Sequence, residues 1–192
     1  MISKERFILA MKFTMAIILL MTAIAIIPKV FSRYQSDTTS NPEIDIAFYI
    51  IDTAYQTQNI ILSEISPSDE PYFVNFTVAN NDGTNRLETE ATYDLKIVTT
   101  TNLPLTYELY KNETYNSSGA TNIINSNTVA TDSDGTYFKT MLTASENFSY
   151  TTDQMNTYQL VVYFPSEYIS HTYQDIVESI DVVIESRQVI DE

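Results

Sequence analysis

Cysteine and tryptophan are absent from this 192-residue chain, and glycine occurs only three times. Without thiols, the chain has no disulfides, no zinc–thiolate or iron–sulfur site and no cysteine nucleophile. Three glycines could hardly build a phosphate-cradling loop, and the sequence holds no P-loop, GxGxxG or HExxH motif. Turns must therefore be built mainly from asparagine, aspartate and serine.

Basic residues are scarce beyond position 33. Five of the ten Lys and Arg lie in residues 1–33 with one acid, whereas the other five face 24 acids, so the two parts carry +4 and −19. Anionic phosphate would repel so acidic a part, and we expect no nucleic acid partner. Its 159 or so residues are ample for one domain with a sizeable core.

Candidate catalytic and metal-ligating residues are few. His171 is the only histidine and has no nucleophile-elbow motif beside it, so a surface loop position is favoured over a Ser-His-Asp triad. Asp132 and Asp134 in TDSDGT are calcium candidates, because alternating carboxylates before glycine begin such loops. The EF-hand pattern fails at Ala130 and Ala144, which leaves an ordinary Asx turn as the alternative. We predict no enzymatic activity and no cofactor.

A long apolar run, FTMAIILLMTAIAII, covers the 15 residues 13–27. It becomes a 21-residue span if the helix begins at Phe7 and Lys12 snorkels, which is long enough to cross a bilayer. We predict a signal anchor or transmembrane helix over residues 1–31, and its membrane-spanning residues include Phe13, Ile17, Leu20, Ile24 and Ile27. A cleaved secretory signal is the alternative, although no Ala-x-Ala motif precedes the best cleavage position, near residue 32.

The charges beside this run predict an orientation. Lys4, Arg6 and Lys12 precede it, while only Lys29 and Arg33 follow it, and basic residues favour the cytoplasmic side. We therefore expect a single-pass protein of the cell membrane with its C-terminal domain outside the cell. The domain would be secreted if the N-terminal segment were cleaved.

The remaining chain has the pattern of an all-β domain. Residues 32–43 are polar and form a predicted tether, and residues 44–192 form the predicted extracellular domain, which is rich in Tyr, Phe, Thr, Ile and Val. Alternation and turn residues predict strands over residues 44–51, 58–65, 72–79, 90–99, 105–111, 137–143, 158–164 and 180–185, with a weaker one near residues 123–124. The predicted fold class is an antiparallel β-sandwich or jelly roll preceded by one transmembrane helix, with a barrel as the alternative.

Two segments carry further expectations. The strand 44–51 places Ile44, Ile46, Phe48 and Ile50 on one face and other apolar residues on the opposite face, which predicts cover on both sides. Residues 165–179 are expected to form a short helix or ordered loop. Its apolar side chains are expected to cover one end of the domain: Tyr168, Ile169, Tyr173, Ile176 and Val177.

Three stretches in order along the chain resemble TasA/camelysin-type exported surface proteins of Firmicutes. They are ILSEISPSDEPYFVNFTVANND, TYDLKIVTTTNLPLTYELYKN and the ending from TYQLVVYFPSE through YQDIVESIDVVIESRQV. The resemblance covers residues 44–189. It implies a jelly-roll-like domain on the cell surface that polymerises into matrix or pilus-like fibres by donating an N-terminal strand to its neighbour.

The candidate donor strand is residues 44–51, with Ile44, Ile46, Phe48 and Ile50 as the inserting side chains. Members of this family lose their signal peptide to a dedicated peptidase, whereas this chain lacks a good cleavage motif. We predict a non-enzymatic, membrane-anchored surface or adhesion protein that is a subunit or anchor of such a fibre. Its expected partners are the membrane, further copies of itself, and other envelope or matrix proteins. The alternative is a membrane-tethered binding module or an accessory subunit of an envelope complex.

Overall fold

The computed structural model describes Lys12, Met15 and residues 45–51, 55–62, 65–169, 171–173 and 176–189. The chain divides into two units, residues 1–41 and 42–192, and the architecture below is that of the second. The predicted tether and Ile44 lie outside the described residues, as do the predicted membrane-spanning residues Phe13, Ile17, Leu20, Ile24 and Ile27. Within the described ranges, no helix is both long and apolar enough to span a bilayer.

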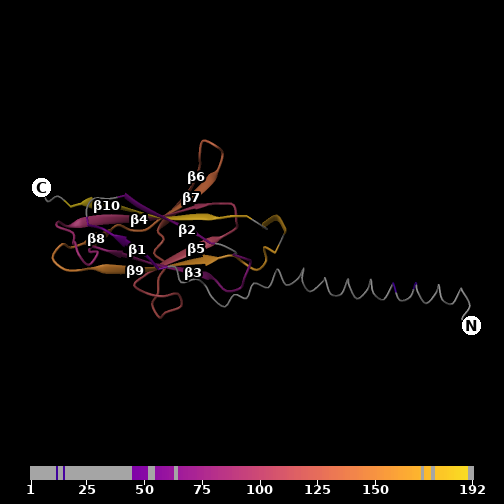
Figure 1. Cartoon of the computed structure of the whole chain (residues 1–192), viewed down its shortest axis with the longest axis horizontal. Coiled ribbons are helices and arrows are strands. Elements are labelled where there is room, and N and C mark those ends of the chain that lie inside the picture. The colour runs from indigo at the N-terminus through magenta and orange to yellow at the C-terminus, as the bar shows by residue number, and fades with distance from the viewer. Residues whose placement is uncertain are drawn as a thin grey trace, which may run out of the picture. The chain divides into compact units, whose positions relative to one another are not determined.

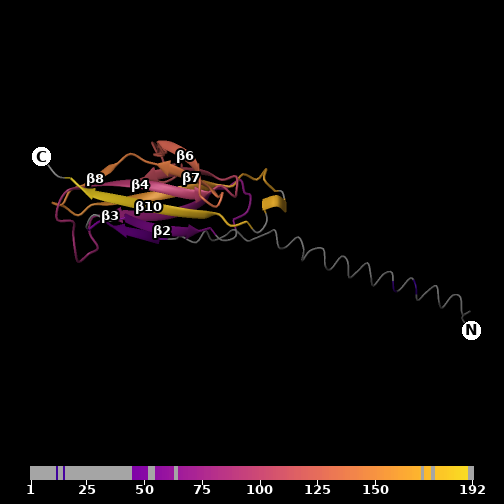
Figure 2. The same cartoon turned by 90° about the horizontal axis from the view of Figure 1, so that it is seen from above.

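Two β-sheets face each other (Figures 1 and 2). The first sheet has the order β1-β3-β9-β5, with strands β1 (Asp45–Tyr49), β3 (Tyr72–Ala79), β9 (Met155–Tyr163) and β5 (Thr106–Lys111). The second has the order β2-β10-β4-β7-β6, with strands β2 (Tyr55–Ile61), β10 (Ser179–Gln188), β4 (Ala91–Thr100), β7 (Tyr137–Leu142) and β6 (Ser126–Thr131). The short strand β8 (Glu146–Phe148) also pairs with β4. This arrangement confirms the all-β, sandwich-like prediction.

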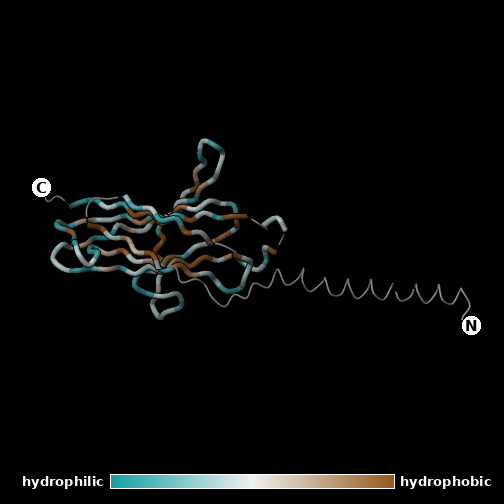
Figure 3. Tube along the Cα trace, viewed as in Figure 1, coloured by the Kyte–Doolittle hydropathy of each residue, from teal (hydrophilic) through white to brown (hydrophobic). Residues whose placement is uncertain are grey.

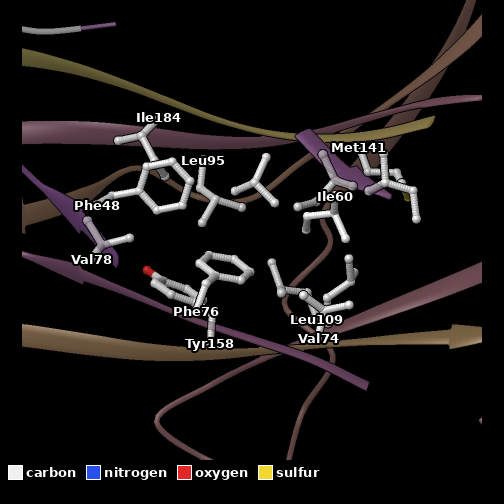
Figure 4. Packing of buried hydrophobic residues seen from close by; sticks show 14 of the residues in the cluster. Phe48, Ile60, Val74, Phe76, Val78, Leu95, Leu109, Met141, Tyr158 and Ile184 are labelled. Carbon is white, nitrogen blue, oxygen red and sulfur yellow. The ribbon is translucent and has the colours of Figure 1, made fainter. Parts of the chain in front are cut away.

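One hydrophobic core lies between the sheets. Phe76 and Tyr158 of the first sheet stack at a centroid distance of 5.0 Å, and Leu95 and Ile184 point toward them from the second (Figure 4). Figure 3 shows hydrophobic residues concentrated along the strands and hydrophilic residues in the loops at both ends. Burial of these apolar faces is the main force that holds the two layers together.

Alternation predicted the central strands well. β3 spans the predicted residues 72–79, and its inward residues Val74, Phe76 and Val78 are buried. β4 alternates buried and half-buried positions over its whole length, with Tyr93, Leu95 and Ile97 inside. The outer face of β4 is polar, as predicted. On this face Lys96 Nζ forms an ion pair with Glu185 Oε2 of β10 at 2.6 Å.

Other strand predictions were wrong. β2 begins three residues earlier and ends four residues earlier than the predicted strand 58–65. Its bounds are set by pairing with β10, where Ile60 lies beside Ile180 and Tyr55 beside Glu185. β6 and β8 were missed. Ile123 and Ile124 form no strand; they pack against the core from a loop, and Ile123 N–H donates to the Leu109 carbonyl.

The segment between β9 and β10 only partly covers the end of the sandwich. It holds the 3₁₀-helix η1 (His171–Tyr173), and Tyr168, Tyr173 and Ile176 pack against the core as predicted. The same prediction was wrong for Ile169 and Val177, which are 81% and 67% exposed. Apolar character alone placed these two residues inside, although no strand period fixes which way they point.

The antiparallel prediction was wrong at one position. β1 pairs with β3 in parallel, with Asp45 beside Asn75 and Tyr49 beside Ala79. The other strand pairs are antiparallel among the residues described. A parallel pair cannot be closed by a tight turn, and here the chain passes from β1 into β2 of the opposite sheet.

Candidate assembly site

The candidate donor strand β1 is an edge strand of the first sheet. β3 is its only neighbour in the sheet order, so the outer edge of β1 has no strand partner among the described residues. The backbone ladder continues one residue past β1, where Ile50 N–H donates to the Ala79 carbonyl at 2.8 Å. β1 therefore satisfies the edge of β3 and becomes the outermost strand of the sheet in its place.

Phe48 and Ile50 anchor β1 to the core. Phe48 is 3% exposed and meets the Phe76 ring edge-on at 6.0 Å, and Ile50 is fully buried. Ile46 is half-buried and packs against the same cluster. Figure 4 shows Phe48 reaching from β1 toward Ile184 on the opposite sheet. Three of the four predicted inserting residues thus share the core-facing side, whereas Ile44 lies outside the described residues.

The prediction of cover on both faces of β1 was wrong. Tyr49 is 44% exposed and Ala47 is exposed, so the opposite face of this strand meets solvent. The backbone of Tyr49 also has a partner on the outer edge of β1, where Gln56 Nε2 of β2 donates to the Tyr49 carbonyl at 2.7 Å. The buried face of β1 specifies the register of the strand on β3, because a shift of one residue would turn Phe48 and Ile50 toward solvent.

The turn at Asp132 and Asp134 uses its carboxylates internally. Asp132 Oδ1 accepts the Ser133 N–H at 2.6 Å, and Asp134 Oδ1 accepts the Thr136 N–H at 2.9 Å. The bond from Thr136 also holds the pKa of Asp134 below its ordinary value. Gly135 closes the turn at a φ of 92°, a conformation that disfavours other residues. The bond from Thr136 to Asp134 is that of an Asx turn, and the described residues hold no convergent group of three or more His, Cys, Asp or Glu.

Calcium is expected to leave the thermal stability of the protein unchanged. Because both carboxylates already accept backbone N–H groups, Tm in excess calcium should stay within about 1 °C of Tm in EDTA. Differential scanning calorimetry checks this. A calcium-dependent rise in Tm that the double variant Asp132→Asn, Asp134→Asn loses would contradict it.

Glu178 is a buried carboxylate that the sequence reasoning missed. It is 1% exposed and accepts three hydrogen bonds: from Thr99 Oγ1 at 2.6 Å, Leu103 N–H at 3.0 Å and Asn102 N–H at 3.1 Å. These bonds tie the start of β10 to the turn after β4. The sequence does hold a signal for its burial. Glu178 lies two residues before Ile180 and four before Val182, so the alternation of this strand places all three on the inward face.

A buried tyrosine pair joins the two sheets. Tyr93 Oη of β4 and Tyr158 Oη of β9 are 2.6 Å apart, and Asn156 Nδ2 donates to Tyr93 Oη at 2.7 Å. Burial raises the pKa of Tyr93 to about 12, and it raises the pKa of Tyr158 as well. Both phenols are therefore held in their neutral form by the fold.

The free energy of unfolding is expected to fall as the pH rises from 10 to about 12. In that window the unfolded chain loses the Tyr93 proton while the native chain keeps it, so the contribution of Tyr93, on the order of 2 kcal/mol, is present below pH 10 and lost as the pH approaches 12. Urea denaturation at stepped pH, with Tyr93→Phe as the control, measures it. A wild-type slope no steeper than that of Tyr93→Phe would contradict the assignment.

An outer aromatic cluster, Phe73, Tyr110, Tyr115 and Tyr163, covers part of the solvent side of the first sheet. Tyr115 comes from the loop after β5, and its ring lies 5.8 to 6.2 Å from the other three. The Tyr110 and Tyr163 hydroxyls both donate to Glu108 Oε2 at 2.8 Å. Because the rings pack on one another and two of their hydroxyls bind Glu108, the cluster covers this part of the sheet.

No family model, curated protein or solved structure matched this chain. The function is therefore argued from the chain's own residues. The feature with the clearest chemical consequence is β1, an edge strand with buried anchors and a parallel partner, and with no strand on its outer side among the described residues.

Proposed function

We propose that this protein is a non-enzymatic, membrane-anchored structural protein of the cell surface, whose copies assemble by exchanging β1. The anchor is the apolar segment 13–27, and the acidic domain lies outside the cell. The observation that supports exchange is the position of β1, which binds at the edge of β3 through Phe48 and Ile50 and has no other strand neighbour among the described residues.

In this proposal β1 of one copy takes the place of β1 in the next copy. The parallel register, Ala47 beside Thr77 and Phe48 beside Val78, is kept, so the same side chains fill the same space in a neighbouring subunit. A strand passed from each copy to the next gives a head-to-tail contact, and such contacts build open fibres unless a ring closes. The resemblance of the sequence to TasA/camelysin-type proteins and the two-sheet, all-β architecture agree with this mechanism.

The N-terminal segment decides the place of a copy in such a fibre. A chain that keeps residues 1–31 stays in the membrane and roots or caps a fibre, whereas a chain that loses them becomes a free subunit. The absence of an Ala-x-Ala motif before residue 32 favours the rooted form.

The N-terminal residue of the mature protein tests the anchor. Mass spectrometry of protein purified from membranes is expected to find residues 1–31 retained, and a start near residues 32–35 would contradict the tether while keeping the fibre subunit. Electron microscopy of the same preparation is expected to show fibres or fibre stubs. A strict monomer that purifies with a stoichiometric partner would instead favour the binding-module alternative.

A further inference from the structure

The outer edge of β6 is the least protected of the four sheet edges. On the first sheet, β5 is capped, since Asn122 Oδ1 accepts the Leu109 N–H at 3.1 Å and Ile123 N–H donates to the Leu109 carbonyl at 2.9 Å. β1 and β2 lie at neighbouring edges and are joined by Gln56. Within the described part of the chain, no hydrogen bond reaches the outer edge of β6.

β6 also lacks the features that usually block strand addition. Its sequence, SNTVAT, has no charge, no proline and no glycine, and all six residues are exposed, with Val129 at 60%. Edge strands are normally guarded by charges, prolines or bulges. The ribbon of β6 and β7 extends beyond the outline of the sandwich (Figure 1), which agrees with the exposure of all six β6 residues.

The hydrogen-bond pattern identifies which groups this edge offers. Asp132 N–H donates to the Thr136 carbonyl across the ribbon, and Thr143 N–H donates to the Leu95 carbonyl on the other side of β7. Asp132 therefore points its backbone groups toward the partner strand, and this direction alternates from one residue to the next along β6. The backbone N–H and C=O groups of residues 126, 128 and 130 accordingly point toward β7. The backbone N–H and C=O groups of Asn127, Val129 and Thr131 point away from it.

These three outward residues are symmetric about Val129. An antiparallel copy of the same strand, related by a two-fold axis through Val129, pairs Val129 with Val129 and Asn127 with Thr131. Every outward N–H and C=O of β6 then finds a partner, and the two Val129 side chains face each other. An edge that satisfies itself in this way is suited to an isologous contact.

The charges at the tip of the ribbon favour antiparallel over parallel pairing of two copies. The chain carries −15 overall, but residues 126–142 contain only Asp132, Asp134 and Lys139 as charged residues, and the ribbon extends away from the acidic body. Antiparallel pairing places the two acidic tips at opposite ends of the joined ribbon, about 30 Å apart, whereas parallel pairing would set them side by side.

We propose that β6 is a dimerisation edge, on which a second copy of this chain adds its own β6 antiparallel about Val129. The second sheet then runs continuously through both copies. This contact is independent of β1 exchange and would link two copies, or two fibres, sideways.

Cysteine crosslinking in the full-length chain tests the register, and the absence of native cysteine makes each signal unambiguous. In membranes of expressing cells, Val129→Cys is expected to form an interchain disulfide, because hydrogen-bonded antiparallel partners have Cα atoms about 5.5 Å apart. Asp134→Cys, which is also exposed on the same ribbon, is expected to form none. Equal crosslinking of both variants, or none by either, would overturn the proposal.

A proline variant separates this contact from misfolding. Val129→Pro removes an N–H that β7 does not use, so the hairpin should persist while the dimer is lost; Val129→Thr should keep both. Light scattering in mild detergent measures the mass, and circular dichroism the fold. A dimer that survives Val129→Pro but is lost when an intrachain disulfide between Ala47→Cys and Thr77→Cys holds β1 in its own subunit would overturn this proposal and leave the proposed function standing.

Discussion

Replacing Phe48 with alanine is expected to destabilise the protein by about 3–5 kcal/mol and to abolish assembly. Phe48 is the largest side chain that β1 inserts, it is 3% exposed, and it contacts Phe76 in the middle of the core. Its removal leaves a cavity wherever β1 binds, in its own subunit or in a neighbour. Both folding and fibre formation should therefore suffer from the same substitution.

Tyr49→Ala is the matched control for this prediction. Tyr49 is the next residue of the same strand, but it points to the solvent face and is 44% exposed, so its loss should change stability by less than about 1 kcal/mol. Urea denaturation followed by tyrosine fluorescence, with electron microscopy of the same samples, separates the two. Equal losses for Phe48→Ala and Tyr49→Ala would mean that β1 does not anchor through its inner face.

Glu178→Ala is expected to lower the free energy of unfolding by about 2–4 kcal/mol, because it removes three hydrogen bonds and leaves the buried Leu103 N–H without its acceptor. The donors most affected are Thr99 Oγ1, whose hydroxyl also lies 3.0 Å from Tyr107 Oη, and the buried Leu103 N–H. The turn after β4 should loosen first. Hydrogen exchange of the Leu103 amide is expected to rise along with the fall in the free energy of unfolding.

Two further variants sharpen the Glu178 prediction. Glu167→Ala removes an exposed glutamate from the same connecting segment and is expected to change stability by less than about 0.5 kcal/mol. Glu178→Gln keeps the shape but turns one acceptor into a donor, and it should fall between wild type and alanine. A Glu178→Ala protein as stable as Glu167→Ala would show that the carboxylate is dispensable.

The strands that sequence alone predicted are those with one buried face. β3 and β4 alternate because each has the core on one side and solvent on the other, and the bounds of β3 were predicted to the residue. β6 was missed because both of its faces are exposed, so no hydrophobic period marks it. β8 is too short, at three residues, for any period to be visible.

Long-range pairing was beyond the reach of local patterns. The sequence located the candidate donor strand and its anchors Phe48 and Ile50, but a two-residue period is the same in parallel and antiparallel strands, so the parallel partner β3 was not predicted. Tyr49 was assigned to a second covered face because it is apolar, although edge strands commonly expose one face. The burial of Glu178 was not predicted, because a glutamate next to a strand is usually exposed unless a partner far along the chain, here Thr99, binds it.

Exchange of β1 between copies is tested most directly by trapping it. Ala47 and Thr77 are register neighbours on the solvent side of β1 and β3, and the chain has no other cysteine. Mixing chains that carry Ala47→Cys with chains that carry Thr77→Cys is expected to give an interchain disulfide on a non-reducing gel. In a chain that carries both substitutions, an intrachain disulfide is expected to hold β1 in its own subunit and to block assembly until a reductant is added. An intrachain disulfide in the double variant, with no interchain disulfide in the mixture, would show that β1 never leaves its own subunit and would contradict the proposed assembly.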